Sequence, residues 1–175
     1  MRALTDVERL GRFMRALGAE ADKETRVYFT GGATAVLLGW RPTTVDIDIK
    51  VVPETDRLFR AIPKLKESLQ INIELASPDD FIPPLPGWAD RSPFVSREGK
   101  ISFHHYDPYA QALAKIERGL AQDRNDVDEL IGRGLVEPKK LLERYEQIEA
   151  QLYRYPAVDP PTFRRKVEAV VSCKA

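Results

Sequence analysis

The sequence predicts an α+β fold, in which a small mixed sheet flanked by helices is followed by a helical C-terminal region. Over the first 106 residues, short β-branched and aromatic segments alternate with amphipathic segments. From Asp107-Pro108 onward the pattern is helical. The 175 residues suffice for one domain, or for a compact core with a helical appendage. We therefore expect a core over residues 1–106 and a helical region over residues 107–175 packed on it.

Composition limits which partners the chain can bind and in which cell compartment it is expected. The 27 basic and 27 acidic side chains cancel, so the chain has no bulk positive field for non-specific binding of nucleic acid. Its one cysteine, Cys173, excludes an intramolecular disulfide and a thiolate metal cluster, which fits a reducing cytoplasm. The N-terminus lacks a secretory apolar region, and no run of about 18 apolar residues occurs. We expect a cytoplasmic protein that does not span a membrane.

The first elements are a helix and a strand that runs into a glycine turn. Thr5 and Glu8 have the spacing of a capping box. Apolar residues follow at helical intervals and would share one face: Val7, Leu10, Phe13, Met14 and Leu17. Residues 27–30 are β-branched and aromatic and lead into Gly31-Gly32. Residues 33–38 then favour a short helix closed by Gly39.

The next strand has an unusual polar face. Residues 46–52 alternate, with Ile47, Ile49 and Val51 on one side. Asp46, Asp48 and Lys50 occupy the other side.

The remaining elements follow from periodicity and from turn residues. Residues 53–69 favour a helix in which Pro63 threatens a kink. Residues 71–75 alternate again and place Asn72 and Glu74 opposite the isoleucines, in a strand that should pair beside residues 46–52. Prolines between residues 83 and 86 predict a rigid surface loop, and residues 94–106 a hairpin. Helices are then expected from Pro108, from the cap Asp123 to residue 134, from residue 138 to about 151, and from residue 160 to about 172.

The polar strand face is a candidate metal site. Carboxylates two residues apart on a strand project from one face, with backbones roughly 7 Å apart, and can share divalent cations. Asp46 and Asp48 have this spacing. Two Mg²⁺ ions about 3.5–4 Å apart could activate an attacking oxygen and stabilise a leaving pyrophosphate. Glu74 is the candidate third ligand, and Asp79 and Asp80 are less regular competitors.

The glycine pair is a candidate phosphate site. Gly31-Gly32 lies between a strand and a helix, where backbone N–H groups can approach a phosphate. Alone, such a pair is more often only a tight turn. The combination of this pair with a following Asp-x-Asp strand occurs by chance much more rarely than either motif alone.

These motifs resemble a known superfamily. Residues 31–39 (GGATAVLLG) followed by residues 43–48 (TTVDID) resemble the signature of the DNA polymerase β-like nucleotidyltransferases. The leucine-leucine-glycine spacing is similar to that of CCA-adding enzymes. The later segment, with Lys115 before Asp123 and Asp126, is similar to AbiEii-like transferases associated with toxin–antitoxin pairs. The commoner turn of the superfamily is Gly-Ser. In this sequence Gly32 occupies the position of that serine.

The resemblance implies transfer of a nucleoside monophosphate from a nucleoside triphosphate to an acceptor that could be RNA, protein or a small molecule. It implies a two-ion Mg²⁺ site at Asp46, Asp48 and Glu74. It also implies nucleotide binding by a further set of residues: Gly31, Gly32, Thr44, Lys50 and Lys115. The alternative is an inactive nucleotide-binding or toxin–antitoxin-type regulatory module, with a partner protein.

Several residues also have a purely structural interpretation. Lys115 could lie on a solvated helix face, and Asp123 could serve only as a helix cap. His104 and His105 are neighbours on a strand, so their rings face opposite sides and cannot chelate one metal ion together. A last group of aromatic and basic side chains could stack a base or anchor loops: Trp88, Arg91 and Tyr106.

Overall fold

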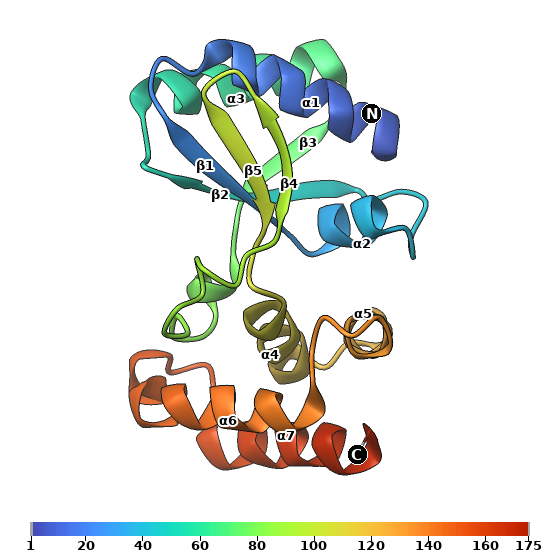
Figure 1. Cartoon of the computed structure of the whole chain (residues 1–175), viewed down its shortest axis with the longest axis vertical. Helices are drawn as coiled ribbons and strands as arrows, with labels where there is room; N and C mark the ends of the chain where they lie inside the picture. Colours follow the sequence, from blue (N-terminus) through green and yellow to red (C-terminus); the bar gives the residue numbers. More distant parts are fainter. Residues whose placement is uncertain (1, 175) are drawn as a thin grey trace. The chain divides into compact units, whose positions relative to one another are not determined.

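The computed structural model describes residues 2–174 and confirms an α+β fold (Figure 1). The chain divides into two compact units. The first unit comprises Met1–Ser77 and Ser92–Tyr106, and the second comprises Pro78–Arg91 and Asp107–Ala175. Residues 78–91 therefore leave the first unit and return to it between two of its strands.

The first unit holds the whole sheet. Its elements are α1 (Val7–Glu20), β1 (Thr25–Thr30), α2 (Gly32–Leu38), β2 (Asp46–Val52), α3 (Asp56–Leu69), β3 (Asn72–Leu75), β4 (Phe94–Glu98) and β5 (Ile101–His105). The strand order is β3-β2-β1-β5-β4. The central strand β1 is antiparallel to β2 and parallel to β5, whereas β2 and β3 run parallel. The predicted hairpin is the antiparallel pair β4–β5.

Helix α1 begins one residue later than the capping-box prediction. The Asp6 carboxylate accepts a hydrogen bond from the Arg9 N–H at 2.9 Å, so Asp6 is the N-cap. Thr5 is instead buried and exchanges backbone hydrogen bonds with Thr44 at 2.8 and 2.9 Å. The capping box of Thr5 and Glu8 was therefore wrong, because tertiary strand-like pairing takes Thr5 out of the cap position.

The hydrophobic core of the first unit lies between the sheet and two helices, α1 and α3, which pack side by side (Figure 1). Phe29 of β1 stacks on Phe103 of β5, with ring centroids 5.6 Å apart. The core takes Ile47, Ile49 and Val51 from β2, as the alternation predicted. Pro63 lies inside α3 without ending that helix.

The polar residues of β2 share the opposite face of the sheet, where Asp46, Asp48 and Lys50 are half-buried. Residues directly opposite on paired strands point to the same side. Because Lys50 is opposite Tyr28, and Tyr28 is opposite His104, the same face continues onto β1 and β5 with aromatic side chains.

The second unit is helical. Its elements are the 3₁₀ helix η1 (Pro78–Asp80), α4 (Pro108–Arg118), α5 (Ala121–Gly132), α6 (Pro138–Ile148), the 3₁₀ helix η2 (Glu149–Arg154) and α7 (Pro160–Lys174). The predicted surface loop is only partly exposed, because Ile82 and Leu85 are buried. Of the helices within residues 2–174, none has both the length and the apolar character needed to cross a membrane.

A partly buried ion pair holds the start of α4. Asp107 caps the helix by accepting a hydrogen bond from the Tyr109 N–H at 3.0 Å. Arg91 donates to the same carboxylate from Nε at 3.1 Å and from Nη2 at 2.7 Å. Burial raises the pKa of Asp107, and the Arg91 hydrogen bonds and charge oppose that rise. The excursion over residues 78–91 is thereby tied to the first turn of α4.

Candidate functional site

The glycine turn adjoins the aspartate strand. Gly31 has φ +62° and ψ −128°, a conformation that strains a residue with a side chain. Thr30 is opposite Asp48 in the β1–β2 ladder, so the turn starts beside that carboxylate. A Cβ built on Gly31 would lie 3.1 Å from Asp48 Oδ2. Only glycine therefore fits this turn comfortably, and it leaves the space beside the Asp48 carboxylate open.

The second glycine is closely covered by the loop that enters β2. A Cβ on Gly32 would collide with Thr44 Oγ1 and would lie 2.7 Å from Thr44 Cβ and 3.2 Å from Arg41 Nη1. Thr44 Oγ1 in turn donates a hydrogen bond to the Asp46 carbonyl oxygen at 3.0 Å. The serine of the commoner Gly-Ser turn would not fit at this position unless Thr44 moved. Thr44 thus links the glycine turn to the first residue of β2.

The parallel register of β2 and β3 gathers the acidic residues. Asp46 is opposite Asn72, and Asp48 is opposite Glu74. The predicted pairing of these strands is therefore confirmed, and Glu74 lies on the face that carries both aspartates. Glu74 is exposed, while Asp46 and Asp48 are half-buried. The competitors Asp79 and Asp80 lie in η1, which belongs to the other unit.

An amide lies among these carboxylates. Asn72 Nδ2 donates hydrogen bonds to Asp46 Oδ1 at 2.5 Å and to Glu74 Oε1 at 2.9 Å. Arg2 Nη1 donates to Asn72 Oδ1 at 2.9 Å. The alternation of β3 placed Asn72 on this face but gave it no role, because an asparagine two residues from a glutamate has no distinctive pattern.

The acids do not form a preformed metal cluster. Across residues 2–174, no group of three or more His, Cys, Asp or Glu side chains is spaced to hold a metal ion. The chemistry of the face nevertheless suits a hard divalent cation, because Asp46, Asp48 and Glu74 supply carboxylate oxygens from neighbouring strands. The missing side chain at Gly31 also leaves room beside Asp48 Oδ2.

The two histidines do face opposite sides of the sheet. His104 accompanies Tyr28, with ring centroids 5.5 Å apart, and its Nε2 lies 2.8 Å from Ser102 Oγ. His105 is buried, and its Nδ1 lies 3.0 Å from Thr34 Oγ1. Burial, and then the charge of His104, lowers the pKa of His105 to about 4. Burial also lowers the pKa of His104.

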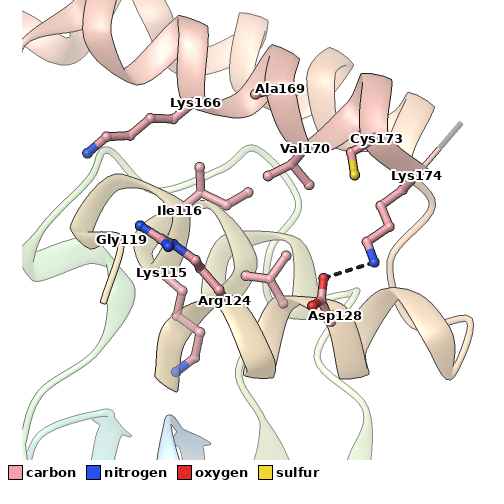
Figure 2. Close-up of a pocket in the computed structure, with 11 residues that line it drawn as sticks. Lys115, Ile116, Gly119, Arg124, Asp128, Lys166, Ala169, Val170, Cys173 and Lys174 are labelled. Atoms are coloured by element: carbon pink, nitrogen blue, oxygen red, sulfur yellow. Dashed lines mark ion pairs between the residues drawn. The ribbon is translucent and has the colours of Figure 1, made fainter. Parts of the chain in front are cut away.

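Lys115 is placed in the second unit, on α4. Its Nζ lies 2.8 Å from Asp126 Oδ2 and 3.7 Å from Asp123 Oδ1, both on α5. The side chain is 11% exposed and each aspartate side chain is 1% exposed, so the solvated-face interpretation was wrong. Figure 2 shows the Lys115 amino group on the side of α4 away from α7.

The prediction that Asp123 is the cap at which this helix begins was wrong, because α5 begins two residues earlier, at Ala121. Leu120 is the N-cap of α5, and Asp123 accepts a hydrogen bond from the Leu120 N–H at 3.1 Å. Arg118 donates two hydrogen bonds to Asp123, at 2.8 and 2.6 Å. Burial would raise the pKa of Asp123, but these hydrogen bonds and the Arg118 and Lys115 charges together lower it. Asp123 therefore serves both as a helix-end acceptor and as an ion-pair partner.

The candidates for base stacking have other roles. Tyr106 is fully buried, and Arg91 is held by Asp107. Trp88 is half-buried.

The sequence model of a family described as nucleotidyltransferase of unknown function (DUF6036) matches residues 5–163. Among solved structures, the chain is similar to an antigenic nucleotidyltransferase-like protein from Paracoccidioides brasiliensis, with 14% sequence identity and a TM-score of 0.47. That similarity covers 74% of this chain and 77% of the other. None of the curated proteins matches.

Proposed function

The chain belongs to the DUF6036 family of nucleotidyltransferases, and we propose that it transfers a nucleoside monophosphate from a nucleoside triphosphate in a metal-dependent reaction. The observation that carries this proposal is the contact between the glycine turn and the aspartate strand. A Cβ built on Gly31 would lie 3.1 Å from Asp48 Oδ2, so a phosphate bound at the turn lies beside this carboxylate. The strand register adds Asp46 and Glu74 on the same face.

The glycine turn binds the triphosphate in this proposal. Without side chains at Gly31 and Gly32, a phosphate can approach the backbone closely. Thr44 holds this turn against the start of β2, and Lys50 adds a positive charge on the same sheet face. These four residues orient the α-phosphorus toward the acidic face.

Asp46 and Asp48 are the proposed cation ligands, and Glu74 the third. Bound Mg²⁺ ions would neutralise the triphosphate charge and favour ionisation of the acceptor hydroxyl. Glu74 is exposed, and Asn72 holds only its Oε1, so its other carboxylate oxygen can turn to a cation while the amide orients the side chain. The acceptor oxygen attacks the α-phosphorus, the bond to the β-phosphate oxygen breaks, pyrophosphate leaves, and Glu74 accepts the acceptor's proton.

For the second unit taken by itself, we propose that Lys115 contacts a phosphate oxygen. It is a cation that is held at a defined position, since Asp123 and Asp126 flank its amino group. A compact ammonium group with three donors suits a phosphate oxygen.

A second candidate is a nucleotide-binding module without turnover, as in the regulatory half of a toxin–antitoxin pair. The observation that favours it is Asn72, whose amide hydrogen-bonds two of the three acids. This module would bind a triphosphate at the same turn but would not transfer a nucleotide.

A transfer assay separates the two candidates. Protein is incubated with each α-³²P-labelled NTP, Mg²⁺, and either total RNA or total protein from cells as acceptor. Wild type is compared with Asp48→Asn and with Asp90→Asn, which removes an exposed carboxylate elsewhere. Losing a residue that only orients a metal ligand typically costs about 10–100-fold in metal affinity or activity, so losing a direct ligand should lower transfer by about 100-fold or more. We expect this loss of transfer for Asp48→Asn, and we expect Asp90→Asn to transfer as wild type does.

Two results would count against transfer at this site. If wild type and Asp48→Asn labelled the acceptor equally, Asp48 would have no part in the reaction. Triphosphate binding with no labelled acceptor at any metal concentration would support the module without turnover.

A further inference from the structure

The second unit contains a pocket that the proposed transfer reaction does not use. It has a volume of about 450 Å³ and lies between α4, α5 and α7 (Figure 2). We propose that this pocket binds a small amphipathic carboxylate, that is, a molecule with one acidic group and an apolar body. The volume falls within the range typical of small-molecule sites, about 300–1,000 Å³.

The middle of the pocket is apolar. Ile116 of α4 and Val127 of α5 form one wall, and Val170 and Ala169 of α7 form the other. Figure 2 shows Ile116 and Val170 directed toward each other across the pocket. No aromatic ring lines it, so an aliphatic body suits these walls better than a nucleobase, which would gain from stacking.

One end of the pocket is cationic. Lys166 donates a hydrogen bond from Nζ to the Glu117 carbonyl oxygen at 2.8 Å, an acceptor that does not neutralise its charge. Within residues 2–174, the Arg124 side chain makes no hydrogen bond or ion pair. Asp123 and Asp126 on the same helix are both paired. Figure 2 shows Arg124 and Lys166 at the same end, next to Gly119. Two cations without acidic partners thus meet at one end of an apolar pocket.

Gly119 leaves this cationic end open. It ends α4 with φ +72°, in the left-handed conformation. A Cβ placed there would lie 3.7 Å from Lys166 Nζ. Gly119 therefore lies directly beside the lysine amino group and adds no side chain of its own between that group and a ligand.

The opposite end is close to neutral and carries a thiol. Lys174 Nζ is paired with Asp128 Oδ1 at 3.1 Å, so these charges compensate. Cys173 is exposed beside them and lines the pocket. This difference between the ends sets the orientation of the ligand. Its carboxylate lies at Arg124 and Lys166, and its apolar body points toward Cys173.

This inference is independent of the proposed transfer reaction. All the residues that line the pocket belong to the second unit. Lys115 is shared with the proposed nucleotide contacts, but its amino group is held by Asp126 rather than directed into the pocket.

Cys173 makes the pocket directly testable, because it is the only cysteine in the chain. The rate at which an aromatic disulfide reagent modifies Cys173 is measured with increasing decanoate, below the concentration at which decanoate forms micelles. Decanoate should slow the modification. Acetate, which lacks the apolar body, and decylamine, which carries the opposite charge, should not.

Charge-reversal variants test the orientation. Arg124→Glu combined with Lys166→Glu should raise the decanoate concentration for half-protection on the order of tenfold or more. Arg165→Glu, which reverses an exposed charge on α7 outside the pocket, should leave it unchanged. Val170→Trp, which fills the apolar middle, should abolish protection without removing a charge. Thermal melting of each variant verifies that it is folded.

The proposal fails if decanoate gives no protection, or if decylamine protects equally well. It also fails if protection persists unchanged in the folded double charge-reversal variant and in Val170→Trp. None of these readings depends on nucleotide or Mg²⁺, so failure here leaves the proposed transfer activity untouched.

Discussion

Asn72 uses its side-chain NH₂ group on two carboxylates, donating to Asp46 at 2.5 Å and to Glu74 at 2.9 Å. Arg2 fixes the amide from the other side by donating to its oxygen. Partners of this kind orient metal ligands, and their loss typically lowers metal affinity 10–100-fold. Asn72 is therefore a positioning residue of the proposed cation site.

Replacement of Asn72 by alanine tests this role. We expect Asn72→Ala to weaken Mn²⁺ binding about tenfold, because Asp46 and Glu74 lose the donor that orients them. Calorimetric titration with Mn²⁺ measures the change. Asn125→Ala, at an exposed position of α5, is the matched control and should bind as wild type does. Unchanged affinity in Asn72→Ala would mean that the amide only fills space.

Other residue-level details could not be predicted from local patterns. The exclusion of a side chain at Gly32 depends on Thr44, twelve positions away, which the loop before β2 brings against it. Likewise Thr5 has the spacing of a cap, yet its pairing with Thr44 leaves Asp6 to perform that role. In both cases a tertiary contact that no local pattern reveals decides the role of the residue.

Among the elements, α4 and α5 are joined by buried charges. Lys115 is 11% exposed and faces Asp123 and Asp126, which are almost fully buried. Removing one partner of a buried pair is costly, because the remaining charge has no compensation.

Lys115→Met should therefore lower the free energy of unfolding by roughly 3 kcal/mol. Urea denaturation measures the loss. Lys139→Met, at an exposed position of α6, should change stability little. A Lys115→Met protein as stable as wild type would contradict the structural role. If it also lost transfer activity, Lys115 would act mainly through the nucleotide.

Most elements of the fold could be predicted from the periodicity of apolar residues and from the turn and cap residues between them. The alternation of residues 46–52 identified β2 because its two faces differ sharply in polarity, and Asp107-Pro108 marked the start of α4. The prediction for the proline-rich loop was less accurate. Turn residues indicate a loop, but they do not indicate that Ile82 and Leu85 will be buried. The site could be predicted where its residues share one strand, and not where packing joins distant segments.

At the scale of the whole molecule, stability should depend on pH through His105. Its pKa falls from 6.5 to about 4 in the folded protein, because burial disfavours the charged ring. Between these values the unfolded chain binds a proton that the folded protein does not, so stability decreases as pH falls from 6.5 toward 4. The contribution is on the order of 3 kcal/mol. The raised pKa of Asp107 acts in the opposite direction at the acidic end.

Comparing wild type with His105→Asn isolates the histidine contribution. We expect the variant to lose less stability between pH 6.5 and 4, because asparagine does not titrate. Urea denaturation at several pH values gives the two slopes. Parallel slopes would show that His105 is not the group responsible.

The central claim is that Asp46 and Asp48 bind a divalent cation beside the glycine turn. Electron paramagnetic resonance of Mn²⁺, titrated into the protein with a non-hydrolysable triphosphate analogue, tests it most directly because free and bound Mn²⁺ are distinguished. We predict that the triphosphate and wild-type protein bind Mn²⁺ together, and that Asp48→Asn weakens this binding at least about tenfold. Equal Mn²⁺ binding by wild type and Asp48→Asn, both folded, would contradict the claim.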